Sequence, residues 1–89
     1  MERHMANVTV YTTKVCPYCT RAKQLLKSKN VEFEEVDISN DPELRMQVVE
    51  KSGGRRTVPQ IFINDKPIGG FDDMAALDKS GELDTLLAG

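Results

Sequence analysis

Hydrophobic and polar residues alternate in one stretch of the chain and recur at helical spacing in the next. In residues 7–12 the apolar Val8 and Val10 alternate with more polar neighbours, and this β-rich stretch predicts a strand. In residues 17–29 apolar side chains return every three or four positions between lysines and arginines, which predicts an amphipathic helix. Pro17 suits the first turn of that helix, because its missing N–H costs no hydrogen bond there.

The rest of the chain, from residue 31 onwards, also consists of predicted strands and helices in succession. Residues 31–38 mix apolar and acidic side chains, which predicts a strand at the edge of a sheet. Residues 39–43 supply an N-cap and an early proline for a helix that Gly53-Gly54 ends. The remaining predicted elements are a strand over 60–63, a turn at Asn64-Asp65, a strand over 66–68, a helix opening at 71–73 with Met74 and Leu77 facing in, and a last short helix carrying Leu83, Leu86 and Leu87.

This order of elements predicts an α/β fold. The first half forms a parallel unit with a right-handed crossover, and the second half contains a hairpin. We therefore expect a four-stranded mixed sheet with helices on both faces. The 89 residues form one domain, assigned to residues 5–89. Residues 1–4 are interpreted as a vector-derived remnant, with Met5 as the native start.

Composition and charge exclude several classes of function. The net charge is −2 and no basic stripe alternates with aromatic residues, so we expect no nucleic-acid partner. No apolar run approaches ~18 residues and no signal sequence is visible, which predicts a cytoplasmic protein without a membrane partner. The basic residues gather around the two cysteines, and the choice between a solvated face and a positive field that attracts an anionic thiol stays open.

Both cysteines lie in one tetrapeptide, Cys16-Pro-Tyr-Cys19. A bridge that closes so short a loop removes little unfolded-state entropy, so it would stabilise the fold only weakly. Structural zinc needs four ligands, and the chain offers these two cysteines and His4, so no metal is expected. Two thiols at this spacing, after a strand and before a helix, indicate a redox pair in a reducing compartment.

The predicted helix assigns different roles to the two thiols. Positions i and i+3 of a helix lie about 5–6 Å apart, a span that a disulfide can bridge. Cys16 stands at the N-cap and is predicted to be the exposed nucleophile, whereas Cys19 is turned inward as the resolving thiol. The helix terminus lowers a thiol pKa by roughly one unit. Backbone N–H groups of Tyr18 and Cys19, with Lys14 nearby, are expected to lower the pKa of Cys16 further.

Three motifs together resemble those of the dithiol glutaredoxins. Cys16-Pro-Tyr-Cys19, Thr57-Val-Pro59 and Gly69-Gly-Phe-Asp-Asp73 occur in the family's order and spacing, and the resemblance runs from about Met5 to Leu87. It implies a thioredoxin-like fold of glutaredoxin architecture and glutathione as co-substrate. The implied activity is that of a glutathione-dependent thiol–disulfide oxidoreductase acting on protein disulfides and on protein–glutathione mixed disulfides.

The resemblance also implies a glutathione site. In the family, the residue at Val58 offers its backbone to the cysteine part of glutathione, and the peptide bond to Pro59 is cis. Gly69-Gly70 lets the backbone approach a ligand closely, and the helix that follows presents N–H groups to a carboxylate. Asp72 accepts from the γ-glutamyl ammonium, and Asp73 shares this role or caps the helix. The implied binding residues are Lys14, Tyr18, Arg45, Thr57, Val58, Pro59, Gly70, Phe71, Asp72 and Asp73.

The cation for the glycyl carboxylate is left open. The family usually carries a lysine at the position of Thr13, and here Lys14 stands one residue later. Arg45 falls near a family glutamine or arginine that reaches the same carboxylate. Arg55 and Arg56 are further candidates, with plain solvation as the alternative for both.

Two other functions remain to be distinguished from the leading one. Some glutaredoxins hold a [2Fe–2S] cluster between two protomers, although the proline after Cys16 looks unfavourable for it. A redoxin reduced by thioredoxin reductase would share the fold without a glutathione site, and the segment 69–73 argues against it. We expect a monomer whose partners are glutathione and disulfide-containing or glutathionylated proteins.

Overall fold

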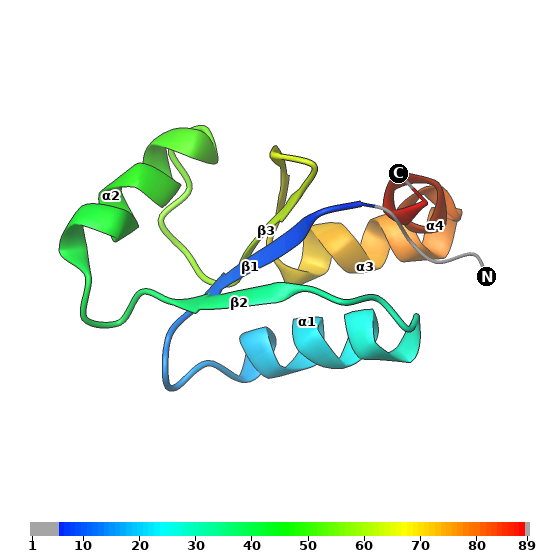
Figure 1. Cartoon of the computed structure of the whole chain (residues 1–89), viewed down its shortest axis with the longest axis horizontal. Helices are drawn as coiled ribbons and strands as arrows, with labels where there is room; N and C mark the ends of the chain where they lie inside the picture. The colour runs from blue at the N-terminus through cyan, green and yellow to red at the C-terminus, as the bar shows by residue number, and fades with distance from the viewer. Residues whose placement is uncertain (1–5, 89) are drawn as a thin grey trace.

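The computed structural model describes residues 6–88. The predicted remnant, residues 1–4, and the predicted native start at Met5 lie outside the described residues. Eight elements follow one another in Figure 1: β1 (Val8–Thr12), α1 (Pro17–Ser28), β2 (Glu34–Asp37), α2 (Pro42–Lys51), β3 (Gln60–Ile63), β4 (Lys66–Gly69), α3 (Phe71–Ser80) and α4 (Glu82–Leu87).

The four strands form one mixed sheet in the order β2-β1-β3-β4. Strand β1 pairs with β2 in parallel and with β3 antiparallel, and β3 pairs antiparallel with β4. The parallel pair needs a crossover, which α1 provides, whereas β3 and β4 need only the two-residue turn at Asn64 and Asp65. Both turn residues have positive φ, 52° and 67°. The predicted four-stranded mixed sheet flanked by helices is confirmed.

The main core lies between the sheet and the helices α1, α3 and α4. The inward positions of β1 and β3 meet the apolar faces of these helices, and Figure 1 shows α2 set apart from them. The predicted inward residues Met74, Leu83 and Leu87 are fully buried. The buried members of this core are Val8, Val10, Ala22, Leu26, Val31, Ile61, Ile63, Met74, Leu83 and Leu87.

Strand β2 is shorter than predicted. The sequence suggests a strand over residues 31–38, whereas the observed strand spans Glu34–Asp37. The N–H of Val31 donates to the carbonyl of Leu26 at 3.2 Å, and Asn30 has φ 59°, so Val31 still belongs to the turn that closes α1. Its burial therefore comes from packing under the helix and not from strand pairing, which the alternation of residues does not distinguish.

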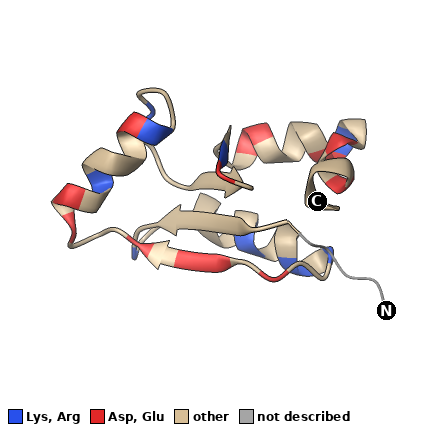
Figure 2. Ribbon diagram, turned by 45° about the horizontal axis from the view of Figure 1, so that its top comes forward, with Lys and Arg blue, Asp and Glu red and all other residues tan. Residues whose placement is uncertain are grey.

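The edge position of β2 is confirmed, and Figure 2 shows acidic residues along it. One of them, Glu35, accepts a hydrogen bond from Thr12 Oγ1 at 3.1 Å and forms an ion pair with Lys23 Nζ at 2.9 Å. Lys23 is the main cause that lowers the pKa of Glu35. These contacts join α1, β1 and β2 close to the cysteine motif. Among the described residues, no helix combines the length and apolar character needed to span a bilayer.

Candidate active site

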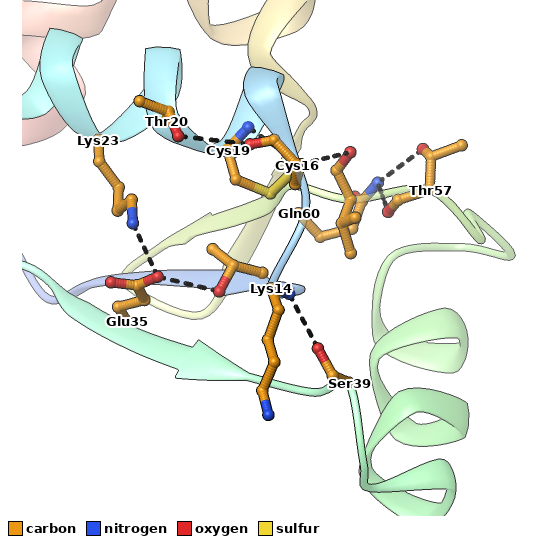
Figure 3. Close-up of a disulfide and its surroundings, with 11 residues drawn as sticks. Lys14, Cys16, Cys19, Thr20, Lys23, Glu35, Ser39, Thr57 and Gln60 are labelled. Carbon is orange, nitrogen blue, oxygen red and sulfur yellow. Dashed lines mark hydrogen bonds and ion pairs between the residues drawn. A yellow bond between two sulfur atoms is a disulfide. The ribbon is translucent and has the colours of Figure 1, made fainter.

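Cys16 and Cys19 form a disulfide at the start of α1, with their Cα atoms 5.2 Å apart (Figure 3). Cys16 is the N-cap residue, and the N–H of Cys19 donates to its sulfur at 3.1 Å. Cys16 is half-buried, whereas Cys19 is only 2% exposed. The structure thus gives the two sulfurs the unequal accessibility that the helix pattern predicts. Pro17 occupies the first helical turn as expected.

The segment that faces the sulfur pair precedes β3. The Val58–Pro59 peptide bond is cis, as the resemblance implies, and the carbonyl oxygen of Val58 lies 3.8 Å from Cys16 Sγ. Gln60, which is 1% exposed, donates from Nε2 to the carbonyl of Thr57 at 2.9 Å. This hydrogen bond from a buried amide fixes the segment before β3, so the backbone of Val58 is held beside the reactive sulfur.

The N-terminus of α3 forms a second wall beside this segment. Gly70 is the N-cap residue, and its N–H donates to Asp73 Oδ2 at 2.9 Å. The same oxygen pairs with an Arg55 guanidinium nitrogen at 2.9 Å. Arg55 first, and the N–H of Gly70 second, lower the pKa of Asp73. Asp73 is thus the helix-capping residue that the sequence left as an alternative, while Asp72 is exposed in the same turn.

Aromatic rings line the third side. The rings of Tyr18 and Phe71 lie 6.3 Å apart at a tilt of 32°, and the guanidinium of Arg21 lies 5.4 Å from the centre of the Tyr18 ring. Stacking of a guanidinium on a ring is favourable by ~0.5–1 kcal/mol at an exposed site. The ring of Tyr18 therefore contacts both Arg21 and Phe71, although half of the residue is exposed.

These walls enclose a cavity of about 450 Å³, here called the active-site groove. Because the segment before β3 and the start of α3 meet at the N-terminus of α1, the groove assembles most of the predicted binding residues. Its lining residues are Tyr18, Arg55, Thr57, Val58, Pro59, Gly70, Phe71, Asp72 and Asp73.

Two predicted binding residues do not line the groove, whereas one of the two loop arginines that the sequence left as further candidates does. Lys14 is exposed, and Figure 3 shows its side chain directed away from the sulfurs. Arg45 is exposed on α2. Arg55 lines the groove, whereas Arg56 does not. The basic loop was visible in the sequence, but the choice between its two neighbouring arginines depends on which one reaches Asp73.

A half-buried cysteine at a helix N-cap, a fully buried partner three residues later and a facing cis-proline define a thioredoxin-like thiol–disulfide oxidoreductase. The comparisons narrow this class, since the family model described as Glutaredoxin matches residues 8–68. Glutaredoxin 3 of Escherichia coli K12 is 54% identical over 83 residues, covering 93% of this chain and 99% of the relative. The chain belongs to the glutaredoxin family and is a glutathione-dependent disulfide reductase.

Solved structures agree with this assignment. The solution structure of glutaredoxin from Brucella melitensis has a TM-score of 0.84 and 51% identity, covering 97% of this chain and 92% of the other. The crystal structure of a buckwheat glutaredoxin–glutathione complex also has a TM-score of 0.84, with 25% identity, covering 94% of this chain and 78% of the other. The backbone similarity is therefore the same at 25% sequence identity as at 51%.

Proposed function

We propose that this chain reduces protein–glutathione mixed disulfides and protein disulfides, with glutathione seated in the active-site groove. The observation that carries the proposal is the position of the half-buried Cys16 sulfur at the N-terminus of α1, 3.8 Å from the carbonyl oxygen of Val58, a residue that lines the groove. A thiolate at this point can attack a sulfur bound in the groove. The glutathione complex of the buckwheat relative supports the choice of ligand.

For a mixed disulfide, the Cys16 thiolate attacks the glutathionyl sulfur. A Cys16–glutathione bond forms, the bond to the protein sulfur breaks, and the protein thiolate leaves with the electron pair and takes a proton from solvent. A second glutathione thiolate then attacks the glutathionyl sulfur, which releases the Cys16 thiolate and oxidised glutathione. The N–H of Cys19 stabilises the thiolate in both steps through the 3.1 Å contact.

For a protein disulfide, Cys16 attacks one of the two protein sulfurs, and the other leaves as a thiolate. The Cys19 thiolate then attacks Cys16 Sγ, which releases the second protein thiol and forms the disulfide of the present structure. Glutathione reduces this disulfide and restores the dithiol. Pairs of this family have potentials of roughly −200 to −230 mV, close to that of the glutathione pool, so the net direction follows the substrate.

The walls of the groove match the parts of glutathione. The backbone of Val58 can pair with the cysteine residue of the tripeptide as an added strand does. The free N–H groups at the start of α3 suit the γ-glutamyl carboxylate, and the exposed Asp72 suits its ammonium. Tyr18 and Phe71 provide apolar surface beside the reacting sulfurs. Arg55 adds a positive charge inside the groove, and Lys14 and Arg45 contribute charge from outside it for the glycyl carboxylate.

The activity is expected in the reducing cytoplasm, from a monomer without metal. The [2Fe–2S] alternative requires Cys16 as a ligand, and Pro17 follows it at the first helical position. Anaerobic reconstitution with iron and sulfide should therefore leave a monomer without visible cluster absorption. A coloured dimer would overturn this part of the proposal and leave the assignment to the family intact.

Turnover of a glutathionylated peptide, coupled to glutathione reductase or to thioredoxin reductase, tests the main proposal. We expect turnover with glutathione and glutathione reductase, and little with thioredoxin reductase in the absence of glutathione. The reverse preference would mean that the groove does not hold glutathione. The Cys16→Ser variant, which lacks the nucleophile, is the control for uncatalysed exchange.

A further inference from the structure

An exposed apolar side chain stands directly before the reactive cysteine. Val15 is 91% exposed, and the other large hydrophobic residues with high exposure within residues 6–88 are Tyr18 and Met46. Single exposed apolar residues are common on protein surfaces. Val15, however, directly precedes Cys16 and Tyr18 follows it by two residues, so both lie close in sequence to the sulfur whose bonds form and break.

Val15 lies outside the active-site groove. The lining residues include Tyr18 but not Lys14 or Val15. The loop is fixed, because the N–H of Lys14 donates to Ser39 Oγ at 2.9 Å and Cys16 caps α1. Val15 is thus held in the open by an anchored backbone, next to Cys16 and outside the set of residues that line the groove.

The chemistry places part of the substrate outside the groove. A mixed disulfide has two halves, and the groove accommodates only the glutathione half. The polypeptide half remains outside, attached to the sulfur that leaves when Cys16 attacks. Residues that flank the substrate cysteine must then lie within a few ångströms of the residues that flank Cys16. The exposed side chain of Lys14, which directly precedes Val15, adds positive charge next to it, so an acidic segment is favoured there.

We propose that Val15 contacts the polypeptide half of the mixed disulfide and makes the enzyme prefer a cysteine with an apolar neighbour in an acidic segment. The inference rests on the proposed function, since it assumes that glutathione occupies the groove. In the reaction, the glutathionyl–peptide S–S bond breaks, the peptide thiolate leaves with the electron pair, and water protonates it. Contact with Val15 acts before and during this step and makes no bond of its own.

The test compares Val15→Ser with the wild type on three substrates. Two are glutathionylated peptides that carry the same aspartate and differ only in Leu or Ser after the cysteine, and the third is the mixed disulfide of cysteine and glutathione. We expect Val15→Ser to lower kcat/KM about five- to tenfold on the leucine peptide, which corresponds to ~1–1.4 kcal/mol, and less than about twofold on the other two. Exchanging the aspartate for asparagine should lower wild-type kcat/KM on the leucine peptide about twofold at low salt.

Met46→Ser is the matched control, because Met46 is also an exposed apolar residue but lies on α2. It should leave all three values unchanged. Equal losses of Val15→Ser on the three substrates would overturn the proposal, since the effect would then be on Cys16 itself, and so would the absence of any loss. If the wild type fails to turn over the cysteine–glutathione disulfide, the proposed function is wrong. If only the preference for leucine is missing, the inference alone is wrong.

Discussion

The backbone N–H of Cys19 donates a hydrogen bond to Cys16 Sγ across 3.1 Å. The donor belongs to the main chain, so exchange of the Cys19 side chain leaves it in place. The role of Cys19 as a hydrogen-bond donor is therefore separable from its role as a thiol. A single substitution can test the two roles independently.

Cys19→Ser should keep the reduction of glutathionylated peptides within about threefold of the wild type, because glutathione resolves that intermediate. The same variant should lose the reduction of protein disulfides by more than ~100-fold, because the second thiol is missing. Both rates can be measured with glutathione reductase coupling. Loss of both activities in Cys19→Ser would contradict the division of roles, whereas Cys16→Ser should lose both.

The reduced enzyme should show a Cys16 thiol that ionises well below the ~8.5 of a free cysteine, since the Cys16 sulfur lies at a helix N-terminus and accepts a hydrogen bond from a backbone N–H. The rate of alkylation by iodoacetamide, measured from pH 4 to pH 10 on Cys19→Ser, should report this ionisation. A midpoint near that of a free thiol would show that the helix terminus does not activate the sulfur.

Asp73→Asn should destabilise the fold at pH 7, because it removes the charge that pairs with Arg55 and lies at the start of α3. The loss should be only about 0.5 kcal/mol, since the side chain is 45% exposed and water screens the ion pair. The pKa of Asp73 is lowered, so its contribution is present above the unfolded-state value of ~3.9 and disappears as the pH falls through the lower folded-state value. Urea unfolding of both proteins from pH 7 to pH 2 measures how the difference changes. A difference that stays constant over this whole range would exclude the charge as its cause.

Gly69→Ala should destabilise the fold by roughly 2–4 kcal/mol, because two costs act together. Gly69 has φ 116°, and an added Cβ would overlap the carboxylate of Asp73. Gly81 is the matched control, since it has φ 86° with nothing within 4 Å of an added Cβ, so Gly81→Ala should cost only ~1 kcal/mol. Displacement of Asp73 should also raise the KM for glutathione in Gly69→Ala. Equal destabilisation by the two variants would show that the overlap is relieved without cost.

Most of the fold was predictable because local patterns and connection rules carry it. Alternation located β1, a short apolar run located β3, and helical spacing located α1. The short turn at Asn64 and Asp65 required an antiparallel pair. The start of β2 was not predictable. Val31 is buried beneath α1 by tertiary packing. Periodicity cannot distinguish a buried valine that pairs in a sheet from one that follows the end of a helix.

The sequence by itself determined the chemistry of this protein. Two cysteines three residues apart at a helix start determine which thiol is the more accessible, because the geometry of one helical turn is local. Only the tertiary structure decided which cation enters the groove. Arg55 and Arg56 are neighbours with the same side chain, and the fold brings Arg55 to Asp73, 18 residues away, through the packing of α3 beside the segment before β3. That choice depends on long-range contacts, which no local pattern records.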